Sequence, residues 1–240
     1  MARKQSTPLW ITLGCGCALL VALVIAAVVA AGYFGVSAFK GYLSDLKDPA
    51  SRTARAAEIL GASRLPEGYV GQLFVRIPWV FDMVILTDGE PMTIVEEGDA
   101  DLDAAAVGEH LFLYVKLRSK RMDDEEIDRM LRGERTSDGV RADVGIELDP
   151  DEELSRGAFE LPPQSLRWVA HRGEIELDDD LPGIFSRVII DCPSDELTRV
   201  AVWFRRDPEE PAAAPSDLAG SPADEAALAE LMGHFNVCAD

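Results

Sequence analysis

The sequence opens with a long apolar segment that constrains what the whole chain can be. Between Lys4 and Lys40 there is no charged side chain, and residues 9–39 are almost entirely apolar. A helix crosses a bilayer with about 20 apolar residues, so this segment predicts a transmembrane helix. Trp10 and Tyr33 lie near its ends, where amphipathic rings favour the headgroup region. A cleaved signal peptide is the alternative, but its apolar part is usually about 7 to 15 residues long.

Small residues recur at every fourth position of this segment. On a helix they form one stripe, which lets two helices approach closely in lipid. We therefore expect the lipid bilayer as one partner and, through this stripe, a protein partner or a second copy of the chain. Chance placement in an Ala-rich helix is the alternative interpretation. The stripe consists of Gly14, Ala18, Ala22, Ala26 and Ala30.

The charge distribution separates this segment from the rest of the chain. Residues 1–40 carry three basic side chains and no acid, which leaves 20 basic and 43 acidic residues after them, a net charge of −23. Such an acidic body argues against nucleic acid as a partner. The basic tail, residues 1–8, favours a cytoplasmic N-terminus. We therefore expect a single-pass protein of the cell (inner) membrane whose body lies outside the cytoplasm.

Patterns typical of strands dominate residues 40–206, which we interpret as one acidic domain. Acidic runs at 149–153 and 178–180 are interpreted as turns and solvated surface. Strands joined by short turns, with helices between groups of strands, predict an α+β fold: an N-terminal transmembrane helix, then a mostly antiparallel sheet with a few helices packed on it. The predicted strands cover residues 69–77, 79–87, 111–118, 140–148, 167–177, 184–191 and 198–205.

Two helices are predicted inside this domain. Asp48 and the proline after it predict a helix over residues 49–60, with alanines on its buried face and Arg52 facing away. Asp123, with a glutamate three residues later, predicts a capped helix over residues 123–132.

The end of the chain predicts a linker and one more helix. Residues 207–222 are rich in Pro, Ala and Ser and predict a flexible linker. Residues 223–240 predict an amphipathic helix, because apolar side chains recur at helical spacing. We expect it to dock on its own domain, with docking on a partner as the alternative. Its docking residues are Leu228, Leu231, Met232 and Phe235.

A short motif connects the chain to known proteins. Leu65, Pro66, Gly68 and Tyr69 form an L-P-x-G-Y turn after the first predicted helix of the domain. In this layout the chain resembles bacterial single-pass membrane-anchored proteins of unknown function that carry a PsbP/Mog1-like α+β domain. The resemblance covers residues 50–206 and implies no catalytic residues.

The candidate sites for chemistry are few. Asp99, Asp101 and Asp103 match the first, third and fifth positions of a calcium loop, but an alanine replaces the loop glycine and His110 the bidentate glutamate. A solvated acidic loop is the favoured interpretation, and we expect no cofactor and no bound metal. The three histidines lack zinc-like spacing, and the sequence contains no nucleophile or phosphate-binding motif.

Two cysteines lie outside the apolar segment. Cys192 and Cys238 form a disulfide if the body occupies an oxidising compartment, and are free buried thiols otherwise.

These features favour a membrane-anchored extracytoplasmic interaction or accessory domain without enzymatic activity. One alternative is an enzyme with an unrecognised carboxylate- or calcium-dependent site. Another is a pseudopilin-like structural subunit, whose apolar helix also precedes a sheet.

Overall fold

The chain divides into two units, Met1–Asp45 and Leu46–Asp240. The computed structural model describes residues 42, 44–92, 104–118, 122–133, 147–176, 180–207 and 218–239. The predicted membrane segment and its stripe from Gly14 to Ala30 therefore lie outside the described residues. Within the described ranges, no helix is both long and apolar enough to cross a membrane.

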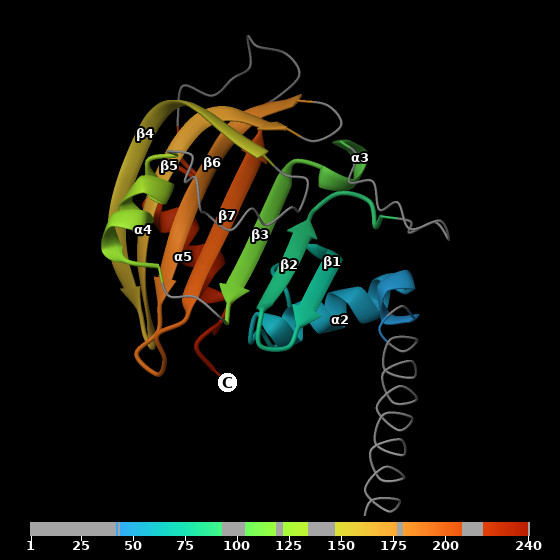
Figure 1. The fold of residues 1–240 in the computed structure, drawn as a ribbon. Helices are drawn as coiled ribbons and strands as arrows, with labels where there is room; N and C mark the ends of the chain where they lie inside the picture. The colour runs from blue at the N-terminus through green and yellow to red at the C-terminus, as the bar shows by residue number, and fades with distance from the viewer. Residues whose placement is uncertain are drawn as a thin grey trace, which may run out of the picture. The chain divides into compact units, whose positions relative to one another are not determined.

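Seven strands form one antiparallel sheet in the second unit (Figure 1). They are β1 (Val70–Ile77), β2 (Phe81–Thr87), β3 (His110–Leu117), β4 (Glu147–Leu161), β5 (Gln164–Glu176), β6 (Asp180–Asp191) and β7 (Thr198–Arg206). Their order in the sheet is β1-β2-β3-β7-β6-β5-β4. Two meanders, β1 to β3 and β4 to β7, are thus joined by the pairing of β3 with β7.

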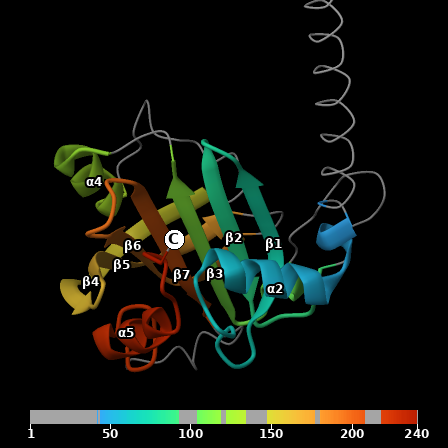
Figure 2. The same ribbon diagram turned by 90° about the horizontal axis from the view of Figure 1, so that it is seen from below.

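Short helices pack on both faces of this sheet (Figure 2). They are α2 (Pro49–Ile59), α3 (Ala104–Val107), α4 (Asp124–Leu131) and α5 (Glu225–Gly233). α2 and α5 lie on one face, where Phe112 of β3 stacks against Phe235 just after α5. α4 lies on the other face, where Ile127 and Leu131 pack against Val169 and Ile189. Successive strand residues point to opposite faces, so both faces contribute to the core.

The α+β assignment with a transmembrane helix is wrong for the part of the chain that the structure describes. This part is mostly antiparallel sheet, with β4, β5 and β6 spanning 15, 13 and 12 residues, and its helices are few and short. The predicted C-terminal helix, 223–240, shrinks to the nine residues of α5. Long antiparallel hairpins satisfy their backbone hydrogen bonds locally, so the sheet extends well beyond the predicted strands.

The acidic run 149–153 is not a turn but part of β4, and this too corrects the sequence analysis. β4 is an edge strand, so its carboxylates reach water without a desolvation cost. The pairing of β4 with β5 shifts register between Pro150 and Glu152 and again between Glu153 and Ser155. Such bulges accommodate a proline inside a strand. Of the strand predicted over 140–148, residues 140–146 lie outside the described ranges.

The caps of two helices agree with those that the sequence predicts, but the buried face of α2 differs from the predicted one. Asp48 caps α2 and accepts a hydrogen bond from the Ser51 backbone N–H, and Asp123 forms a capping box with Glu126 on α4. Arg52, predicted to face solvent, is fully buried and donates to the carbonyls of Leu46 and Met92 at 2.8 and 2.6 Å. These two carbonyls bind the terminal nitrogens of the cation, which a periodicity analysis places on the exposed face.

Substitution of Leu231 by Asp tests the packing of α5. Leu231 is 7% exposed, so the Leu231→Asp change buries an unpaired carboxylate and should lower the free energy of unfolding by several kcal/mol. Ala226 is exposed on the same helix, and Ala226→Asp is the matched control. Urea unfolding of both variants measures the difference. Equal midpoints would show that α5 is not part of the core.

Candidate functional site

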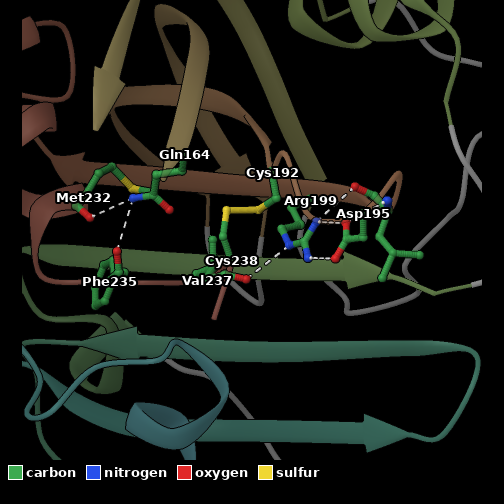
Figure 3. The surroundings of a disulfide bond; sticks show 9 residues. Gln164, Cys192, Asp195, Arg199, Met232, Phe235, Val237 and Cys238 are labelled. Atoms are coloured by element: carbon green, nitrogen blue, oxygen red, sulfur yellow. Dashed lines mark hydrogen bonds and ion pairs between the residues drawn. A yellow bond between two sulfur atoms is a disulfide. The ribbon is translucent and has the colours of Figure 1, made fainter. Parts of the chain in front are cut away.

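The C-terminal segment after α5 returns across the sheet and is held there at several points (Figure 3). The docking residues Leu228, Leu231, Met232 and Phe235 are all buried against their own domain. The Gln164 side-chain amide donates to the carbonyls of Met232 and Phe235 at 3.4 and 3.1 Å. A disulfide joins Cys192, at the end of β6, to Cys238, as the sequence analysis paired them.

Arg199 of β7 anchors the same segment from inside. Its guanidinium is fully buried, and its Nε donates to the Val237 carbonyl at 3.2 Å. Its two terminal nitrogens donate to the carboxylate of Asp195 at 2.7 and 2.5 Å. These hydrogen bonds lower the pKa of Asp195 from 3.8 to about 2. A bidentate pair of this kind is stronger than a single-point ion pair.

A turn next to α2 also depends on this segment. The Asn236 backbone N–H donates to the Leu60 carbonyl at 3.0 Å. Gly61, which follows Leu60, has φ +62°, and a Cβ there would collide with the Asn236 carbonyl. The C-terminal segment therefore connects α2, the sheet and the β6–β7 turn.

A cavity of about 560 Å³ opens beside this disulfide, between α4 and the β6–β7 turn. Much of its charge is paired internally: Arg199 binds Asp195, and Arg167 lies 3.7 and 3.4 Å from Asp124 and Asp191. Asp123 is engaged as the cap of α4. Most of the acidic side chains that line the cavity therefore have a structural partner.

The calcium candidates Asp99, Asp101 and Asp103 lie outside the described residues. His110 instead belongs to a group with Asp88 and Glu109, whose potential ligand atoms lie within 4.8 Å of one another. Asp88 Oδ1 accepts from the backbone N–H groups of Glu109 and His110, both at 2.8 Å, and its Oδ2 lies 2.7 Å from His110 Nδ1. Both carboxylate oxygens thus serve the turn that leads into β3, so we assign this group a structural role.

The L-P-x-G-Y motif also has a structural role here. Gly68 has φ +85°, which is the left-handed region that a type II turn requires, and Tyr69 N–H donates to the Pro66 carbonyl. The Tyr69 hydroxyl accepts a hydrogen bond from Trp203 Nε1 at 3.1 Å. Burial raises the pKa of this hydroxyl. The motif fastens the start of β1 to β7.

The tip of the β1–β2 hairpin differs from all these sites in its backbone. The Val80 N–H donates to the Ile77 carbonyl at 3.0 Å, which closes a turn around Pro78 and Trp79. Trp79 has φ +65°, the left-handed region that glycine or asparagine normally occupies. A residue with a Cβ pays about 1 to 2 kcal/mol for this conformation. The tip therefore carries local strain.

The side chains of this tip are exposed and apolar. The exposed fraction is 85% for Trp79, 42% for Ile77 and 46% for Val80. These are the large apolar side chains that the described part of the chain leaves exposed. Adjacent exposed apolar side chains of this kind form a candidate interaction surface. We call residues 77–80 the hairpin tip.

Basic side chains border the hairpin tip. Arg118, just after β3, is tied to it by a hydrogen bond from its backbone N–H to the Val80 carbonyl at 2.9 Å. Its guanidinium lies 2.6 Å from Asp82, and that of Arg76 lies 3.5 Å from the same carboxylate. One buried acid thus positions two partly exposed arginines beside the exposed tryptophan.

The sequence pattern does not predict this surface, because it places Trp79 in a strand over 79–87. The structure begins β2 at Phe81 and places Pro78 and Trp79 at the centre of the turn. In a type II turn, which often has proline at its second position, the third position requires a positive φ and favours glycine. A tryptophan in that place was the signal available in the sequence.

Comparison with known proteins leaves the site to be interpreted from its own geometry. No protein-family model, no curated protein and no solved structure matches the chain.

Asp195→Asn should destabilise the protein in a manner that depends on pH. The folded-state pKa of Asp195, about 2, is below the ordinary value of 3.8, so the ionised carboxylate contributes stability above about pH 4 that is lost as the pH falls through 2. The urea midpoints of wild type and variant should therefore differ at pH 6 and converge toward pH 2. Glu160→Gln, on exposed β4, is the control. A difference that stays constant with pH would contradict the assignment.

Trp79→Gly should leave the fold as stable as before or stabilise it by up to about 1 kcal/mol, because glycine adopts a positive φ without strain. Val80→Gly, at the next position, lacks this compensation and should cost about 0.5 to 1 kcal/mol. Thermal unfolding compares the two. A loss of stability in Trp79→Gly larger than in Val80→Gly would mean that Trp79 packs within the domain.

Proposed function

We propose that the chain is a membrane-anchored extracytoplasmic interaction domain whose contact element is the hairpin tip. The apolar segment 9–39 holds it at the membrane, and the sheet presents the tip. The observation that carries the proposal is Trp79, which is 85% exposed and has φ +65°. Both the exposure and the strain disfavour this arrangement in the isolated domain. Strain of this kind persists where a function requires it.

The disulfide supports the extracytoplasmic placement. Disulfides persist in oxidising compartments and are rare in the cytosol. The bond between Cys192 and Cys238 closes a loop with a sequence separation of 46 residues. A loop of this length contributes about 4 kcal/mol in the chain-entropy account. The domain is therefore best suited to a compartment in which this bond is kept.

The scaffold around the tip supports a role in recognition. β1 and β2 pair along their length, from Val70 with Thr87 to Ile77 with Phe81, and β3 adds a third strand beside them. Three paired strands hold the tip in one position, so little conformational freedom is lost when it is covered. A preorganised aromatic anchor of this kind is typical of residues that dominate a binding surface.

Oxidative footprinting of the full-length protein in native membranes tests this proposal. If the tip is engaged, hydroxyl radicals should oxidise Trp79 no more than Trp168, which is 2% exposed. A free tip should be oxidised many times more than Trp168. Trp203, 5% exposed, provides a second internal standard. Strong oxidation of Trp79 in native membranes would overturn the proposal.

The placement is tested separately. A reporter that is active only outside the cytoplasm, fused after Asp240, should be active, because the short basic tail stays inside. A carbonate wash should leave the protein in the membrane pellet, because apolar burial holds it there. Activity of a cytoplasmic reporter instead would invert the orientation and remove the oxidising compartment from the proposal.

A further inference from the structure

We infer that the hairpin tip seats in the headgroup region of an anionic bilayer, with Trp79 as the inserted ring and the bordering arginines on lipid phosphates. This inference rests on the proposed function and names the partner that covers the tip. Tryptophan favours the membrane interface because its ring is apolar and its N–H is polar. Ile77 and Val80 supply aliphatic surface on either side of it.

Charge is the second argument. The body as a whole is strongly acidic, yet basic residues gather at this end of β1 and β3. Arg76 and Arg118 border the tip, with side chains 42% and 34% exposed. Guanidinium groups bind phosphate through paired hydrogen bonds, and each basic residue near an anionic surface strengthens binding.

The distribution of acids agrees with this assignment. Acidic side chains at the same end of the sheet line the cavity beside the β6–β7 turn, and Asp195 and Asp191 there lie next to Arg199 and Arg167. Next to the tip, Asp82 is buried between Arg76 and Arg118, and Glu58 lies 3.3 Å from Arg76. The acids on both sides are thus paired with arginines, which reduces the repulsion of an anionic surface.

The length of the chain supplies the third argument. The apolar segment ends at residue 39, and the second unit begins at Leu46. The intervening residues 40–45 reach at most about 20 Å when fully extended. If the apolar segment is inserted, this short stretch of chain tethers the body to the bilayer. Confinement raises the effective concentration of headgroups at the tip, so a small apolar tip suffices for contact.

The test uses the full chain in lipid nanodiscs, with no other protein present. One set of discs contains phosphatidylcholine alone, and the other also contains phosphatidylglycerol. Oxidation of Trp79 relative to Trp168 is measured in both. We expect the ratio of Trp79 oxidation to Trp168 oxidation to be low in the anionic discs and clearly higher in the neutral discs. An equally low ratio in both would overturn anionic phosphate as the ligand.

Charge reversal completes the test. Arg76→Glu should lower the ratio of covered to uncovered tip by more than about fivefold in anionic discs, because it removes one basic residue, worth about fivefold, and adds an acid. Arg156→Glu makes the same change on exposed β4 and should leave the ratio unchanged. Thermal unfolding of each variant verifies the fold. An unchanged ratio in Arg76→Glu would overturn the role of the basic border.

The two proposals fail in different ways. Protection of Trp79 in native membranes but in neither kind of disc would leave the interaction domain standing with a protein on its tip, and would overturn the lipid inference. Strong oxidation of Trp79 in native membranes and in discs would overturn both.

Discussion

The buried ion pair of Arg199 and Asp195 is the interaction on which the rest of the domain depends. Burial of a guanidinium is costly unless its donors are satisfied, and the β6–β7 turn and the Val237 carbonyl together satisfy those of Arg199. The strand, the turn and the C-terminal segment must therefore be in place at once. The disulfide at Cys238 ties the same segment to β6. Two independent bonds thus keep α5 on the sheet.

The ion pair and the disulfide allow a short helix, α5, to cover part of one face of a large sheet. An isolated helix of nine residues is not stable in water, so α5 depends on packing. Phe235 stacks on Phe112, and the Asn236 N–H reaches the carbonyl of Leu60 at the end of α2. The N-terminal and C-terminal parts of the domain meet at this point. A sheet secured in this way presents a strained hairpin tip at its edge without loss of the fold.

Part of the site was predictable from the sequence. The pairing of Cys192 with Cys238 and the packing of Leu228, Leu231, Met232 and Phe235 rest on residue type and helical spacing. The hairpin tip was not predicted, because apolar residues on both sides of Pro78 predict strands whether or not they are buried. Arg52 was placed on the wrong face for a similar reason. A periodicity analysis places a charged side chain on the exposed face of a helix. Arg52 is buried because carbonyl groups distant from it in the sequence accept its hydrogen bonds.

The sequence by itself determined the elements whose causes are local. Asp48 and Asp123 cap their helices because the acceptor and the backbone N–H lie within one turn. Only the tertiary structure decided that the acids of β4 form an edge strand and that Trp79 stands exposed at φ +65°. The physical reason is that burial depends on what packs against a residue. Those neighbours come from parts of the chain that no local pattern contains.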